Sequence, residues 1–432
     1  METTLETIPV DVMGCITTFL DARSILQIRL VSRQLVDKVP RYVLSQIFSE
    51  KTIQLNREDL EKFIYITSQG RAGCLLQRCT LIGLDFCGID YETDPEYPVL
   101  IRLLTEAFVN IKEHSPSSSL LSLNLGVRNL YRVGKRLDYY PIPESTPKHS
   151  GNTAKWVLHA ARTALQGSHL SVDHHLELFT SIEDEPISRL HYATILSAGD
   201  CTASTAMFSS LKKLSFCVSS KYEYNWAAGN ATIRGEDVTI QKEHATMLLK
   251  RLPLLLASMP KLEDLDVHWY NIGSPPVEDH PPDIDPSTRL VFPRLKRCSL
   301  EGLYVSADDL LAFLKNLETT ELVLTFINLV QGTWVPIFDY LLSSSSTIAS
   351  YSLDDLMENG RLVHFNIPGR SKFLYRNIVL GPNTFHRRPH EVERPINYSI
   401  GPSAKRPQDY HPSLRHFYSS KRIRYGALAA RD

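Results

Sequence analysis

A six-residue pattern, apolar-x-x-apolar-x-apolar, recurs along the 432-residue chain and constrains its fold more than any other feature. The alternating second half of each copy is typical of a short strand with one buried face. Clear copies begin at Leu81, Leu120, Ile187, Leu211, Leu262, Leu295 and Leu362, and a poorer copy begins at Thr319. Helical patterns lie between several copies, at residues 99–111, 154–165, 243–256, 307–317 and 335–342. This alternation predicts an α/β fold with parallel strands joined by right-handed crossovers.

The spacing of the copies tests whether they form a repeat. Consecutive copies lie 24 to 67 residues apart, and two of the spacings equal 24 residues. Those two match a leucine-rich repeat of roughly 20–29 residues, whereas the longer ones require insertions. A pattern this simple occurs a few times in any α/β domain, so a non-repeat α/β domain is the alternative. The ordered alternation with helices favours an irregular leucine-rich-repeat-like solenoid over residues 51–380.

Composition and charge set expectations about nucleic-acid binding, membrane insertion and cellular location. The chain has 47 Lys and Arg against 48 Asp and Glu, so nucleic-acid binding through excess positive charge is not expected. Residues 381–432 differ, with ten basic and four acidic residues, and predict a tail that is disordered or peripheral. No apolar run approaches the roughly 18 residues of a membrane span, and the acidic N-terminus does not resemble a signal peptide. Seven cysteines without zinc spacing indicate a reducing compartment, so the protein is expected in the cytoplasm or nucleus.

The sequence contains no recognisable catalytic motif. It lacks a phosphate-binding P-loop, a G-x-S-x-G elbow and an H-E-x-x-H zinc helix. Cys74 and Cys79 have no second matching pair, and His174 and His175 are expected in a solvated turn. We therefore predict no metal and no cofactor. An enzyme whose site is assembled from distant residues is an alternative, which a deep pocket of converging acids and histidines would favour.

The first 50 residues follow a pattern of their own. Apolar residues at i, i+4, i+7 and i+8 from Val12 predict a short first helix. Ser24, three residues before Gln27, predicts the start of a second helix, which carries apolar residues as far as Leu35. Pro40 ends this helix and suits the first turn of a third. Three short helices bury too little surface to be stable alone. The module is therefore expected to bury its remaining apolar surface on a partner.

The order of residues in this segment resembles an F-box. The matching run is Leu5-x-x-Ile8-Pro9-x-Asp11-Val12-x-x-x-Ile16-x-x-Phe19-Leu20-Asp21, followed by Ser24-Ile25-Leu26-x-Ile28-Arg29-Leu30-Val31-Ser32-Arg33-x-Leu35. It departs from the family pattern at Ile8, where leucine is usual, and at Asp11, where glutamate is common; Gly14 also lies within the first helix. Residues 292–303, 307–314 and 332–334 resemble the C-terminal regions of fungal F-box proteins, which are irregular leucine-rich-like arrays.

The resemblance implies a non-catalytic role as the substrate-receptor subunit of an SCF-type ubiquitin ligase. The F-box (residues 1–50) would dock on a Skp-family adaptor, which joins a cullin and a RING subunit, and the following domain would hold a protein target. A scaffold or regulatory protein that binds the adaptor without delivering substrates is the alternative. Carried over position by position, the adaptor-binding candidates, some of which must instead pack the module, are Ile8, Pro9, Val12, Ile16, Phe19, Leu20, Leu26, Leu30, Val31 and Leu35.

Two aromatic clusters are the candidates for target recognition. Tyr222, Tyr224 and Trp226 lie in a segment without periodicity, and His268, Trp269 and Tyr270 follow the strand pattern at 262–267. Residues just after the strands of a solenoid line one rim, where partners often bind. Packing beneath adjacent insertions is the alternative for both clusters. The acidic, proline-rich segment 274–287 is expected to form a loop or flap of the same surface.

Overall fold

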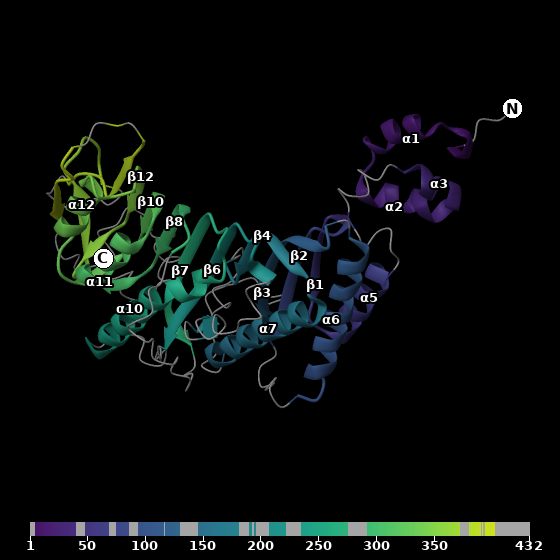
Figure 1. The fold of residues 1–432 in the computed structure, drawn as a ribbon, viewed down its shortest axis with the longest axis horizontal. Helices are drawn as coiled ribbons and strands as arrows, with labels where there is room; N and C mark the ends of the chain where they lie inside the picture. The colour runs from purple at the N-terminus through teal and green to yellow at the C-terminus, as the bar shows by residue number, and fades with distance from the viewer. Residues whose placement is uncertain are drawn as a thin grey trace, which may run out of the picture.

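The computed structural model describes residues 5–39, 48–68, 75–85, 94–115, 117–129, 146–180, 190–191, 194–195, 207–221, 235–274, 292–371, 380–389, 391 and 394–401. Figure 1 shows two parts: a small helical module near the N-terminus, and a body in which strands stand side by side with helices along one face.

The N-terminal module has a small core. It comprises a 3-10 turn (Leu5–Thr7), α1 (Val10–Thr17), α2 (Ala22–Val31) and α3 (Arg33–Lys38). Its buried apolar side chains include Met13, Ile25, Leu35 and Val39. The Lys38 ammonium donates hydrogen bonds to the carbonyl oxygens of Glu6 and Ile8, the second at 2.7 Å. This lysine ties the start of the module to the end of α3.

The second predicted helix, which was expected to run from Ser24 to Pro40, begins earlier and is divided in two. The Asp21 carboxylate, rather than Ser24, caps α2 by accepting the backbone N–H of Ser24 at 2.8 Å. Ser32 adopts an extended backbone, and its hydroxyl accepts the N–H of Gln34 at 3.2 Å, which starts α3 as a separate helix. The predicted third helix lies outside the described residues apart from its end at Phe48.

An 11-stranded sheet forms the body. Its strands lie in sequence order apart from β5, which pairs β6 beside this path, and they pair in parallel until the antiparallel β15. The strands are β1 (Glu50–Gln54), β2 (Arg78–Asp85), β3 (Ser119–Asn129), β4 (Ser171–Leu178), β5 (Leu190–His191), β6 (Lys213–Lys221), β7 (Asp264–Ser274), β8 (Leu295–Glu301), β10 (Thr319–Thr325), β12 (Ser350–Asp354) and β15 (Thr384–Arg387). The α/β fold with mostly parallel strands, predicted from the repeated pattern, is confirmed.

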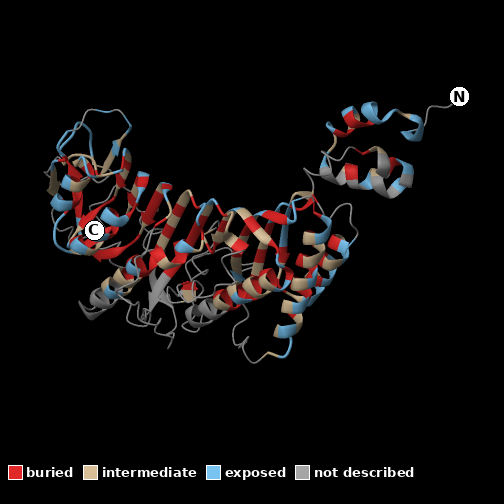
Figure 2. Cartoon of the chain, in the orientation of Figure 1, coloured by how far each residue is buried: buried red, intermediate tan, exposed pale blue. Residues whose placement is uncertain are grey.

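Helices cover one face of this sheet (Figure 1). They are α5 (Arg57–Ser68), α6 (Tyr97–His114), α7 (Thr146–Ser168), α10 (Gly235–Ala257), α11 (Ala307–Asn316) and α12 (Val335–Leu342). All five predicted helices are present, whereas α5 was not predicted. Most leucines of the repeated pattern face the helices and are buried, which gives the alternating colours along the strands in Figure 2. Leu84 is an exception, because it lies on the opposite face of β2 from Gly83, which approaches α7, and Leu362 does not belong to this sheet. Among the described residues, no helix has both the length and the apolarity that crossing a membrane requires.

Residues 295–365 repeat one structural unit. A strand of the main sheet ends in a tight turn and is followed by a short strand of a second, 5-stranded sheet, which contains β9 (Tyr304–Ser306), β11 (Asn328–Gln331), β13 (Met357–Glu358), β14 (Arg361–Phe365) and β16 (Tyr398–Ile400). Gly302, Phe326 and Asp355 turn the chain with positive φ angles of 82°, 60° and 49°. Their N–H groups donate to the carbonyl oxygens of Thr325 and Asp354, which precede the next two turns, and of Asn383, which precedes β15, at 3.1, 2.9 and 3.2 Å. Successive units are thus joined by equivalent backbone hydrogen bonds.

The predicted domain boundary at residue 380 lies too early. Strand β15 pairs with β12, and β16 pairs with β14. The Tyr398 hydroxyl donates to the Glu358 carboxylate at 2.8 Å, and the Tyr398 ring packs edge-on against Phe338. Because these contacts join residues 384–400 to both sheets, this part of the expected tail belongs to the body. The remainder, residues 402–432, lies outside the described residues.

The close approach of α7 to β2 at Gly83 provides a test of this packing. A Cβ atom at Gly83 would lie 2.3 Å from Cγ2 of Val157, whereas one at Gly126, on the neighbouring strand, would meet nothing within 4 Å. We expect Gly83→Ala to lower the free energy of unfolding by about 1–3 kcal/mol, since overpacking forces α7 to move. Gly126→Ala, the matched control, should change it by no more than about 0.5 kcal/mol in urea denaturation. Equal effects of the two substitutions would contradict the helix–strand packing.

Candidate functional site

The N-terminal module exposes large apolar side chains. Phe19 is 89% exposed, Val31 75%, Val10 52%, Leu5 49% and Val12 47%. We call these five residues the exposed apolar set. Full burial of one such side chain is worth about 1.5–3 kcal/mol, and the module's own core leaves them in water. Large apolar side chains left exposed on so small a module favour a binding role.

The structure sorts the predicted adaptor contacts by exposure. Pro9, Val12, Phe19 and Val31 are exposed, and Ile8, Ile16 and Leu20 are half-buried. Leu35 is only 2% exposed, so it packs the module and is removed from the predicted contact surface. The side chains of Leu26 and Leu30 lie outside the described residues. Leu5 and Val10 were missed, although both are apolar residues at the start of the same motif.

The face of the main sheet opposite the helices carries mostly polar side chains. On β7 and β8, Asp266, His268 and Glu301 are half-buried on this face, whereas their neighbours Leu265, Val267 and Leu300 are buried against the helices. Strand alternation produces this division, because successive side chains point to opposite faces. We call the polar surface the open face.

Strand register aligns the open face into rows. Near the N-terminal ends of the strands, the row comprises Glu50, Arg78, Ser122, His175, Lys213, Asp264, Arg297, Glu321 and Ser350. The middle row comprises Thr52, Thr80, Asn124, Glu177, Ser215, Asp266, Ser299, Val323, Ser352 and His386. Near the C-terminal ends, the row comprises Cys217, His268, Glu301, Thr325, Asp354 and Thr384. The first two rows cross almost the entire sheet. Side chains from many strands therefore meet on one continuous surface.

His268 lies between two carboxylates on the open face. Its Nε2 is 3.2 Å from Oδ1 of Asp266, and its Nδ1 is 3.2 Å from Oε2 of Glu301. Burial alone lowers the pKa of His268, but hydrogen bonds and attraction from both carboxylates outweigh it and raise the pKa to about 10. An imidazolium held in this way is a fixed positive charge and not a general base at neutral pH.

His175 lies on the same face and titrates in the opposite direction. Its Nε2 is 3.2 Å from the Ser215 hydroxyl. Burial and the positive charge of Lys213 lower the pKa of His175. This histidine belongs to β4, so the expectation of a solvated turn at 174–175 is wrong.

The residues of the two predicted target-binding clusters do not lie together on one surface among the described residues. His268 lies on the open face, but Trp269 is completely buried on the helix side and is removed from the predicted surface. Strand alternation explains the separation of these adjacent residues. The side chain of Tyr270 lies outside the described residues, as do Tyr222, Tyr224, Trp226 and nearly all of segment 274–287. The polar rows themselves were missed, although their residues alternate with the apolar positions of the repeated pattern.

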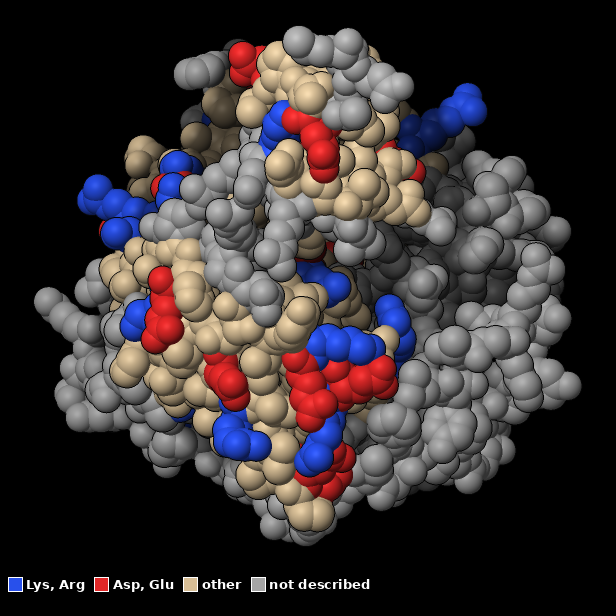
Figure 3. All heavy atoms as spheres, turned by 90° about the vertical axis from the view of Figure 1, so that its right-hand side faces the viewer, with Lys and Arg blue, Asp and Glu red and all other residues tan. Residues whose placement is uncertain are grey.

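Acidic and basic side chains are mixed at the end of the molecule seen in Figure 3. On α5, Lys62 pairs with Glu58 at 2.6 Å, and Arg57 pairs with Glu96 at 3.1 Å. Arg297 pairs with Glu321 at 3.3 Å on the open face. Because the acid and the base of each pair neutralise each other, these residues do not form a surface of a single charge sign.

The described residues contain few groups suited to catalysis. Cys79, Cys217 and Cys298 are buried, and burial raises the pKa of Cys79 to about 12; Cys74 lies outside the described residues. Among the described residues, no group of three or more His, Cys, Asp or Glu could hold a metal ion. The described lining of the cavity between α7 and α10 contains no acid and no histidine. The converging acids and histidines that would favour an enzyme are not found there.

The chain matches no protein-family model and no curated protein. The exposed apolar set and the open face are therefore the features that bear on its function.

The opposite pKa shifts of His175 and His268 can be measured directly. We expect the His268 ring to stay protonated at pH 8 in NMR titration, while His175 loses its proton below pH 6.5. Since the pKa of His268 rises from 6.5 to about 10 on folding, its contribution to stability is complete below pH 6.5 and is lost as the pH rises through about 10. His268→Gln should therefore destabilise the protein at pH 6 and progressively less towards pH 10. A neutral His268 at pH 7.5 would contradict the two-carboxylate geometry.

Proposed function

We propose that this protein is the substrate-receptor subunit of an SCF-type ubiquitin ligase. Its N-terminal F-box would bind a Skp-family adaptor, and its body would hold a protein target near the cullin-bound ligase machinery. The observation that carries the proposal is the exposed apolar set on a module with a small core. The mechanism is proximity, because tethering a target raises the local concentration of its lysines near the conjugating enzyme.

Energetics support adaptor binding by the module. Phe19 and Val31 are the two most exposed large apolar side chains of the described residues. Covering the five members of the exposed apolar set would bring roughly 1.5–3 kcal/mol for each fully buried side chain, before the cost of association. A docked helical partner would thus supply the apolar contacts that the module's few core residues cannot.

The body fits the proposed leucine-rich-repeat-like solenoid, which would present the target-binding surface. Three features support this classification: strands in sequence order, leucines buried under the helices, and equivalent hydrogen-bonded turns at Gly302, Phe326 and Asp355. Repeat arrays of this kind present long continuous surfaces to their partners. The open face is the surface we propose for the target, with His268 near its centre.

Adaptor binding is tested by charging the exposed apolar set. Phe19→Asp combined with Val31→Asp should weaken co-purification of the Skp-family adaptor at least about 100-fold, since each change places a charge in an apolar interface. Both side chains are exposed, so the fold should survive. Tyr65→Asp on α5 is the matched control, because Tyr65 is 67% exposed but lies in the body. Full adaptor capture by the double variant would refute the proposal.

Target binding is tested on the open face. Val323→Arg and Ser352→Arg, which are register partners on β10 and β12, should reduce target capture by about tenfold or more while adaptor binding stays unchanged. Asp339→Arg, on the exposed side of α12, is the control. The readout is the set of proteins that accumulate on the receptor when the cullin is inactivated. If no protein accumulates on the unmodified chain, the scaffold alternative replaces the receptor.

A further inference from the structure

The helix layer has an interruption over β4. Successive helices pack closely in the series α5, α6, α7 and again in α10, α11, α12, but among the described residues α7 and α10 do not make comparable contacts. Only short segments around Ile195 and Phe208 cover the sheet between them among the described residues. The interruption leaves a cavity of about 60 Å³. This cavity lies on the helix side of the sheet, away from the open face.

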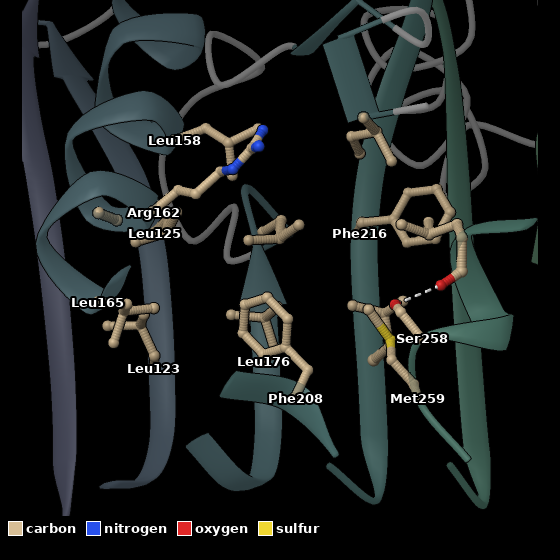
Figure 4. Close-up of a pocket in the computed structure, with 15 residues that line it drawn as sticks. Leu123, Leu125, Leu158, Arg162, Leu165, Leu176, Phe208, Phe216, Ser258 and Met259 are labelled. Atoms are coloured by element: carbon tan, nitrogen blue, oxygen red, sulfur yellow. Dashed lines mark hydrogen bonds between the residues drawn. The ribbon is translucent and has the colours of Figure 1, made fainter. Parts of the chain in front are cut away.

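The described residues that line the cavity are apolar except for Ser258 and one charged group, Arg162. Leucine and phenylalanine side chains of β3, β4 and β6 form its floor, and α7 and the end of α10 form its walls (Figure 4). Most of the fifteen described lining residues are buried, whereas Leu158, Arg162, Phe208 and Ser258 are half-buried and mark its mouth. The Ser258 hydroxyl already donates to the Leu255 carbonyl at 2.8 Å. Arg162 is therefore the group that can recognise a polar ligand atom.

Arg162 has no acidic neighbour on its helix. The α7 sequence contains lysines and this arginine but no Asp or Glu. No carboxylate of the described residues forms an ion pair with Arg162 within 4 Å. Figure 4 shows its guanidinium extending from α7 over the space between the apolar side chains. An arginine is always charged and has five N–H donors, so a carboxylate is its natural ligand.

Cavity size limits the apolar part of the ligand. A dry cavity of about 150 Å³ holds a benzene molecule, so about 60 Å³ holds a shorter group such as a branched alkyl end. We propose that this cavity binds a small monocarboxylate with a short branched apolar tail. The tail occupies the space between β4, α7 and α10, and the carboxylate pairs with Arg162 at the mouth. This site is separate from the surfaces proposed for adaptor and target.

The proposal can be tested with 4-methylpentanoate as the probe. Titration of the full chain, followed by the methyl NMR signals of Leu176 and Ile195, should give saturable shifts. The neutral isostere 4-methylpentan-1-ol should bind roughly tenfold more weakly, since it lacks the charge that Arg162 recognises. Arg162→Met should weaken acid binding roughly tenfold and remove the preference over the alcohol. Arg102→Met, at an exposed arginine of α6, is the matched control and should leave binding unchanged.

Filling the cavity provides an independent test. Ala161→Leu places added carbon atoms in the cavity and should abolish binding of both acid and alcohol. Leu158→Phe narrows the half-buried mouth and gives the same test if Ala161→Leu does not fold. The proposal is overturned if the acid and the alcohol bind equally, because the Arg162 stem would then merely cover apolar surface with its charge in water. It is also overturned if saturating probe leaves the methyl signals of the lining residues unchanged.

Discussion

The structure depends on the alternation of side chains along parallel strands that lie in sequence order. Because each strand pairs with the one before it in nearly constant register, the apolar positions of many strands form one surface and the polar positions form another. The helices bury the first surface, where Leu214, Leu265 and Leu322 are at most 1% exposed. The second surface remains polar and continuous.

The equivalent turns of the C-terminal units hold the last strands in line. Asp355 is almost fully buried with a positive φ, and its carboxylate accepts a hydrogen bond from the buried Asn383 side chain. A left-handed backbone at a non-glycine residue is costly, so it persists where local hydrogen bonds hold it. Asn383 also immediately precedes β15, which covers the edge of the main sheet. The contact therefore links the repeated turns to the strand that ends the array.

Sequence periodicity predicted much of the body because leucine spacing reflects burial directly. It missed β4, where the polar Asp173 occupies the first apolar position of the pattern before Leu176 and Leu178. It also missed β12, although Ile348, Tyr351 and Leu353 follow the pattern, and the copy at Leu362 forms an antiparallel strand of the second sheet. It also treated the segment from Ser24 to Pro40 as one helix, since the hydrogen bond that the Gln34 N–H donates to the Ser32 hydroxyl has no counterpart in the apolar pattern. For the site, adjacency in sequence was misleading. His268 and Trp269 are neighbours on a strand and consequently lie on opposite faces, a result that the twofold period of strands already implies. The carboxylates beside His268 come partly from another strand, which no local pattern could identify.

We propose separate tasks for the two parts of the chain, with the module binding the adaptor and the body binding the target. Hydrogen exchange of the full chain, measured with and without a purified Skp-family adaptor, tests this division most directly. We expect slower exchange in residues 5–39, above all around Phe19 and Val31, and no change in β1 to β15. Unchanged exchange in the module, or protection confined to the open face, would contradict it.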